Sequence, residues 1–115
     1  KFGCTAVHWA ASSGNLETCR WLFEQGFDFG VLNHAGHGVV SNAAWKGWRD
    51  VIEWFVLGCD ADGNKCKCPE LRWQLRVRDK EGKSAASIAR EGGHEEIARW
   101  LEELEREDIE RETPI

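Results

Sequence analysis

Three of the five cysteines, Cys59, Cys66 and Cys68, lie close together in a stretch otherwise rich in Asp, Gly and Asn. Clustered thiolates bind zinc when four ligands complete a tetrahedron. One residue separates the last two cysteines, which is closer than paired zinc ligands usually are, and a fourth ligand would have to come from His34 or His37. We therefore expect free thiols and no metal ion, with a disulfide from Cys59 to Cys66 or Cys68, or a metal site, as the alternatives.

Catalytic residues do not stand out in this sequence. No acid, base and nucleophile occur at a known catalytic spacing, and no glycine-rich phosphate loop follows a strand pattern. Cys4 and His8 combine a thiol with a base, which is one way to activate a nucleophile, but Cys4 lies in an expected turn. We therefore expect no enzymatic activity and no cofactor.

The net charge and the apolar content of the chain limit the kinds of partner that it can bind. The formal net charge is −5, whereas nucleic-acid binding requires a basic face. No apolar run reaches the roughly 18 residues that a membrane-spanning helix needs. We expect protein partners, possible membership of a large complex, no nucleic acid and no membrane span. Since the chain begins with Lys1 and contains no methionine, we also expect a fragment or processed form of a longer chain.

A pattern of glycine, alanine, glycine and tryptophan occurs three times along the chain. Its members are Gly3, Ala10, Gly14 and Trp21, then Gly36, Ala43, Gly47 and Trp54, and finally Gly82, Ala89, Gly93 and Trp100. The first shift is 33 residues and the second is 46, so 13 additional residues separate the second and third copies. A period near 33 indicates an array of helical repeats.

The residues of the first copy predict a helix, a turn, a second helix and an extended loop. Ala10 and Ala11 are small and let neighbouring helices approach closely, and Gly14 is typical of a helix C-terminus. Apolar residues at helical spacing then mark an amphipathic second helix, namely Leu16, Cys19, Leu22 and Phe23. A unit this small cannot bury its apolar face alone, so the copies must stack.

The repeated unit resembles the ankyrin repeat. The first copy reads GCTAVHWAASSGNLE and keeps the threonine and histidine of the family pattern as Thr5 and His8. The resemblance implies that His8 bonds the Thr5 hydroxyl and a neighbouring turn, which commits it to structure rather than catalysis. The second copy has Gly38 and Ser41 at these positions, and the third has Ser87 in place of the histidine. We expect the second copy to be locally weaker, because Gly38 has no hydroxyl to cap its helix.

The resemblance implies an all-α fold, a stack of ankyrin-type helix-turn-helix repeats forming a solenoid. We expect a single domain over 1–115, with repeats at 3–35, 36–81 and 82–113. A loop insertion occupies 59–71, and the charged residues 102–113 extend the last helix as a cap. An acidic docking tail is the alternative for this last segment, although such a charge run is usually an exposed helix.

The seven tryptophans divide into groups by repeat position. Trp21, Trp54 and Trp100 share one position and are expected to pack partly between units. Trp48 begins a second helix and is expected to be partly buried. Trp73 is placed in an extended return strand of the insertion, covering the second unit.

The expected binding face consists of the first helices and turn tips, which line the concave surface of ankyrin-like stacks. Residues 33 apart fall side by side there, so Trp9 neighbours Asn42 and Ser12 neighbours Trp45. The expected partner-binding residues are Trp9, Ser12, Ser13, His34, His37, Asn42, Trp45 and Lys46. An aromatic centre with a polar rim has the composition of an interface hot spot. For Trp9 the alternative is a ring that only fills space between helices.

Two functions follow from this reading of the sequence. The first is a non-catalytic module that binds a protein partner on its concave face. The second is a structural subunit or linker that is permanently integrated in a larger assembly. Metal binding through the cysteine-containing insertion ranks third.

Overall fold

The computed structural model describes residues 6–33, 36–58 and 69–112. Within these ranges the chain forms six α-helices and one 3-10 helix, η1, and contains no strand. The elements are α1 (Ala6–Ser13), α2 (Leu16–Glu24), α3 (Val39–Lys46), α4 (Arg49–Leu57), η1 (Leu71–Arg76), α5 (Ala85–Glu91) and α6 (Glu95–Glu112). The all-helical fold of helix-turn-helix repeats is confirmed.

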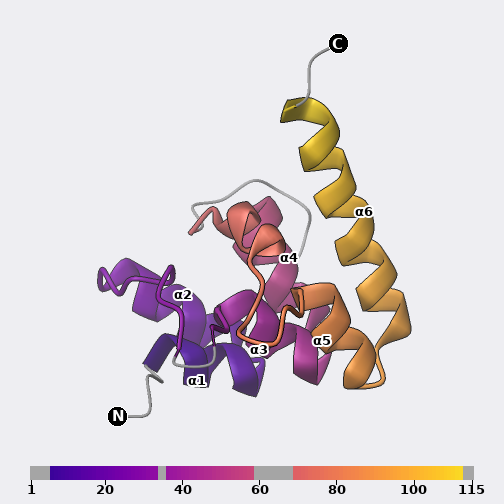
Figure 1. Cartoon of the computed structure of the whole chain (residues 1–115). Helices are drawn as coiled ribbons and strands as arrows, with labels where there is room; N and C mark the ends of the chain where they lie inside the picture. The colour runs from indigo at the N-terminus through magenta and orange to yellow at the C-terminus, as the bar shows by residue number, and fades with distance from the viewer. Residues whose placement is uncertain (1–5, 34–35, 59–68, 113–115) are drawn as a thin grey trace.

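The α-helices form three successive hairpins, α1–α2, α3–α4 and α5–α6. Figure 1 shows the first helices of the hairpins, α1, α3 and α5, side by side in one row, and α3 packs against both of the others. The 3-10 helix η1 packs against α3, α4, α5 and α6. Because the first helices are neighbours, their side chains share one face of the molecule.

Glycine closes the first two hairpins for a steric reason as well as a conformational one. Gly14 has φ of +73° and Gly47 has φ of +81°, the left-handed region that L side chains rarely adopt. A Cβ at Gly14 would collide with the ring of Trp48, and a Cβ at Gly47 would collide with the ring of His94. The second and third hairpins each place a ring against the glycine turn of the preceding hairpin.

The chain offers a matched pair of substitutions that separates these two reasons. Gly82 has the same φ of +81° as Gly47, but a Cβ there meets no atom within 4 Å. We expect Gly82→Ala to lower the free energy of unfolding by about 1 kcal/mol through backbone strain alone. We expect Gly47→Ala to cost about 1 kcal/mol more, because the ring of His94 must move. Urea denaturation measures both values, and equal costs would contradict the packing role of His94.

The core is built around an aromatic cluster of Trp54, Phe23, Phe29 and Phe55. The Trp54 ring lies 5.7 Å from Phe23 and 6.0 Å from Phe29 between centroids, both edge to face. Phe23 and Phe29 belong to the first hairpin and its loop, whereas Trp54 and Phe55 belong to α4. The cluster therefore joins the first two hairpins, and it buries Trp54 to 1% exposure.

The prediction that the three equivalent tryptophans are packed alike is wrong. Trp21 is 56% exposed, while Trp100 is half-buried with the guanidinium carbon of Arg49 4.4 Å from its ring centroid. Phe23 and Phe29 beside Trp54, and Arg49 beside Trp100, come from the preceding hairpin in each case. No described hairpin lies on that side of Trp21, so its ring stays open.

The end of the insertion is a 3-10 helix, so the prediction of an extended return strand is wrong. Leu71, Gln74 and Leu75 of η1 are buried. Trp73 is 47% exposed, and its ring edge lies beside Gly30 in the loop of the first hairpin. Residues 59–68, with their three cysteines, lie outside the described residues.

Gln74 supplies the helix cap that Gly38 lacks. Its side-chain oxygen accepts a hydrogen bond from the backbone N–H of Val40 at 3.2 Å, at the N-terminus of α3. Its Nε2 donates to the carbonyl oxygen of Phe29 at 3.3 Å. Gln74 is also buried, so one amide satisfies two backbone groups from different hairpins. The weakness expected at Gly38 is thereby offset by a residue distant in the sequence.

We expect Gln74→Met to lower the free energy of unfolding by about 2 kcal/mol. Methionine keeps the length of the side chain but leaves the N–H of Val40 and the carbonyl of Phe29 without a partner, and each unpaired buried group costs about 1–3 kcal/mol. Hydrogen exchange at Val40 should accelerate more than exchange in α5, whose cap Ser84 accepts from the N–H of Ser87. Unchanged protection at Val40 would contradict this role of Gln74.

The charged C-terminal segment continues α6 to Glu112, as expected for an extended capping helix. Arg72 of η1 donates to Asp108 at 2.6 Å, and Arg78 donates to Glu105 at 2.7 Å. Leu104, which directly precedes Glu105 on the helix, is buried. The acidic side of the helix therefore packs on the chain itself, which favours the capping helix over an acidic docking tail.

Candidate protein-binding face

The row of first helices and the adjoining turn tips carry most of the residues expected to bind a partner. Two neighbouring hollows lie on this face, and they share Ser12 and Asn42. The structure thus brings seven of the eight expected residues together, while His34 lies outside the described residues.

The outer pocket lies over α1 and α3 and has a volume of about 350 Å³. Its lining residues are His8, Trp9, Ser12, Ser13, Asn42 and Lys46. Trp9 is 75% exposed, so its ring does not fill space between the helices. The expected proximity of Trp9 and Asn42 is confirmed.

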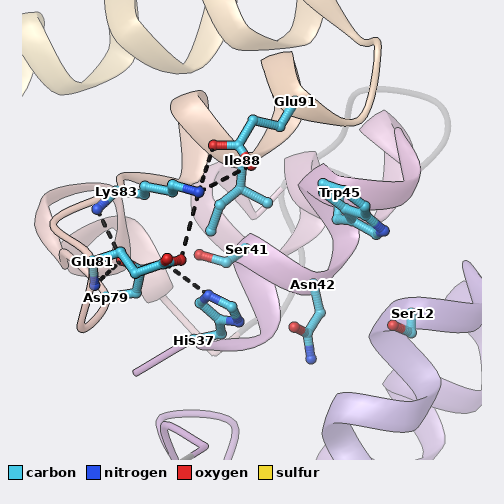
Figure 2. A pocket seen from close by; sticks show the side chains of 10 residues that line it. All are labelled: Ser12, His37, Ser41, Asn42, Trp45, Asp79, Glu81, Lys83, Ile88 and Glu91. Atoms are coloured by element: carbon cyan, nitrogen blue, oxygen red, sulfur yellow. Dashed lines mark hydrogen bonds and ion pairs between the residues drawn. The ribbon is translucent and has the colours of Figure 1, made fainter. Parts of the chain in front are cut away.

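The inner pocket lies between α3, α5 and the turn tips and has a volume of about 330 Å³. Its lining residues are Ser12, His37, Ser41, Asn42, Trp45, Asp79, Glu81, Lys83, Ile88 and Glu91. Figure 2 shows Trp45 on one side of this pocket, and Asp79, Glu81 and Lys83 on the other. Trp45 is 48% exposed. An aromatic wall therefore faces a charged one.

Equivalent residues close the two described turn tips. Asn33 accepts a hydrogen bond from the N–H of His37 at 3.0 Å, and Asp79, which lies 46 residues later, accepts from the N–H of Lys83 at 2.9 Å. The two tips are joined because His37 Nε2 donates to the free carboxylate oxygen of Asp79 at 2.9 Å. His37 is therefore half-buried and paired, whereas it was expected to project from the surface together with His34.

His8 ties the first hairpin to the next tip. Its Nε2 lies 3.3 Å from the carbonyl oxygen of His37 and donates to it. This confirms the expected bond from His8 to a neighbouring turn, while Thr5, the other expected partner, lies outside the described residues. Burial lowers the pKa of His8, which favours the neutral form of the ring.

The charges of the inner pocket are fixed by local hydrogen bonds. The backbone N–H of Lys83 and the side chain of His37 lower the pKa of Asp79. Glu91 raises the pKa of Lys83, whose Nζ lies 2.9 Å from a Glu91 oxygen and 3.5 Å from a Glu81 oxygen. Three acidic residues, Asp79, Glu81 and Glu91, therefore line the pocket together with Lys83.

Trp48, at the start of the second helix of its hairpin, was expected to be partly buried. The ring of Trp48 packs on Gly14, and its Nε1 donates a hydrogen bond to the carbonyl oxygen of Ser12 at 2.8 Å. Part of the ring is exposed, as expected for a partly buried residue.

Cys19 is buried, and burial raises the pKa of its thiol to about 12, which makes it unreactive. Across the ranges that the structure describes, no three His, Cys, Asp or Glu side chains are grouped to hold a metal ion. The cysteines of the metal hypothesis lie outside those ranges.

Comparison with known families agrees with the geometry of the first two hairpins. Residues 7–56 match the family described as ankyrin repeats (many copies). Over this range the chain is similar to the ankyrin repeat family. Ankyrin repeats are in general protein–protein interaction modules rather than enzymes. The search of curated proteins finds no match, and no helix in the described residues has the length and apolar character to cross a membrane.

The acidic wall of the inner pocket was not among the residues predicted from the sequence. The shift of 33 relates the first two hairpins, and the expected face did not include the third. A further shift of 46 places Lys83 at the position of His37 and Glu91 at the position of Trp45. That alignment would have placed Glu91 beside Trp45, because equivalent positions are neighbours in a stack.

Proposed function

We propose that this chain is a non-catalytic protein-interaction module that binds its partner on the face formed by α1, α3, α5 and the turn tips. The main support is that Trp9 and Trp45, on adjacent first helices, are exposed and line neighbouring pockets. Tryptophan is enriched among the residues that dominate binding energy. Serine, asparagine and lysine side chains surround the two rings and provide a polar rim.

The binding residues proposed on this face are Trp9, Ser12, Ser13, His37, Asn42, Trp45 and Lys46, with His34 at the adjoining tip. A glycine with positive φ closes the third hairpin at Gly93, as Gly14 and Gly47 close the first two. This supports a division into repeats at 3–35, 36–81 and 82–113 within one domain.

A second candidate function is a permanent structural subunit of a larger assembly. It is favoured by Trp21 and Phe27, which are exposed away from the proposed face. Permanent interfaces are larger and more apolar than transient ones, so a subunit of this kind would use both surfaces.

Co-purification from the native source, followed by mass spectrometry, tests both functions. A module should lose its partner when Trp9 and Trp45 are both changed to alanine, and should retain it with Trp73→Ala. A structural subunit should instead recover a fixed set of proteins in constant proportion and lose them with Trp21→Ala. Recovery of the same partners by all variants would rule out the proposed face.

A further inference from the structure

The inner pocket lies where the second hairpin has Ser41 in place of the histidine of the first hairpin, His8. His8 reaches the carbonyl oxygen of His37 in the next tip. Ser41 is equivalent to His8 by the shift of 33, and Lys83 is equivalent to His37 by the shift of 46. A serine side chain is too short to make the same contact. The space that an imidazole would take contributes to the pocket of about 330 Å³.

The Ser41 side chain opens into this pocket without a partner of its own. The residue is only 8% exposed, and no hydrogen bond joins its hydroxyl to another described residue. Figure 2 shows it in the middle of the lining side chains. Because the hydroxyl is accessible only from the pocket side of a residue that is otherwise buried, a polar group bound in the pocket could hydrogen-bond to it.

The walls of the pocket suit a cation. The ring of Trp45 forms one wall, and aromatic faces attract cations. Asp79, Glu81 and Glu91 provide three carboxylates against the single ammonium group of Lys83. Lys83 is held by Glu81 and Glu91, so it does not offer a free positive charge to an anion.

We propose that the inner pocket receives the guanidinium group of an arginine from the protein partner, an inference that rests on the proposed function and specifies its chemistry. The planar guanidinium stacks on the ring of Trp45 and donates to the carboxylates at the opposite wall. The Ser41 hydroxyl accepts a further hydrogen bond at the floor. Arginine fits better than lysine, because lysine has a compact ammonium group that neither stacks on an indole nor donates from a flat fork.

A titration with N-acetyl-arginine amide, followed by NMR, tests this site in the whole chain. The indole N–H signal of Trp45, assigned with a Trp45→Phe variant, should shift and saturate. N-acetyl-citrulline amide has the same shape without the charge and should give no shift. An equal response to the citrulline or the lysine derivative would overturn the proposal.

Two variants connect the response to the pocket. Ser41→His introduces into the second hairpin the histidine that the first hairpin has as His8. The variant should melt at or above the wild-type temperature, while its affinity for the arginine derivative should fall at least about tenfold. Lys83→Met removes the competing cation and should raise the affinity several-fold. Undiminished binding by a folded Ser41→His variant, or weaker binding by Lys83→Met, would contradict the assignment.

The outcome is separable from that of the proposed function. If the macromolecular partner requires Trp45 but the arginine derivative gives no shift, the binding face stands and the arginine pocket is wrong. If the derivative binds at Trp45 but the partner tolerates Trp9→Ala and Trp45→Ala together, the pocket stands and the proposed face for the partner is wrong.

Discussion

Trp45→Ala is expected to weaken partner binding by more than about 2 kcal/mol, or roughly thirtyfold, while leaving the melting temperature nearly unchanged. The ring is 48% exposed and forms the aromatic wall of the inner pocket. Its removal takes away the largest apolar contact available to a partner there. Little stability is lost, because the apolar core is formed by other residues, including Trp54 and Phe55. Isothermal titration calorimetry with the co-purified partner measures the affinity, and thermal melting measures the stability.

Trp73→Ala is the matched control for this experiment. Trp73 is 47% exposed, which is nearly the same as Trp45, but it lies in η1 and lines neither pocket. The two variants therefore remove equally exposed rings from different surfaces. If Trp45→Ala unfolds the protein, or if Trp73→Ala weakens binding more, the partner binds elsewhere and the insertion becomes the better candidate.

The architecture was predictable because the repeated residues are the ones that form the turns and the helix contacts of the fold. Gly14 and Gly47 close hairpins that need a left-handed residue, and alanines at equivalent positions allow the first helices to approach closely. The proximity of Trp9 to Asn42 follows from the same period, without any knowledge of the side-chain contacts. These features are local, or they repeat with a fixed shift, so one sequence reveals them.

Features that depend on a particular long-range partner were not predictable. The cap of α3 comes from Gln74, whose side chain crosses from η1 to a backbone group with no repeat relationship to it. The different surroundings of Trp21 and Trp54 depend on whether a hairpin lies on the facing side, which a shared repeat position does not encode. The inner pocket combines Trp45 of the second hairpin with Asp79, Glu81 and Glu91 of the third, and the expected binding face did not include residues of the third hairpin.

Trp54→Ala is expected to lower the free energy of unfolding by about 3–5 kcal/mol, which is the usual cost of removing a buried tryptophan or phenylalanine. Its ring lies edge to face with Phe23 and Phe29 and within 5.5 Å of Phe55 between centroids. Removal leaves a cavity at the contact between the first two hairpins, where three aromatic rings lose a neighbour. Urea denaturation followed by circular dichroism measures this loss.

Trp21→Ala is the matched control, because Trp21 has the same repeat position and the same residue type. Its ring is 56% exposed, so the substitution should change the free energy of unfolding by no more than about 0.5 kcal/mol. A large difference between the two variants would show that burial by the preceding hairpin, rather than the residue type or its place in the repeat, determines what this tryptophan contributes. Similar costs would mean that something covers Trp21 in solution, and the second surface would then be the one that the protein uses to join its assembly.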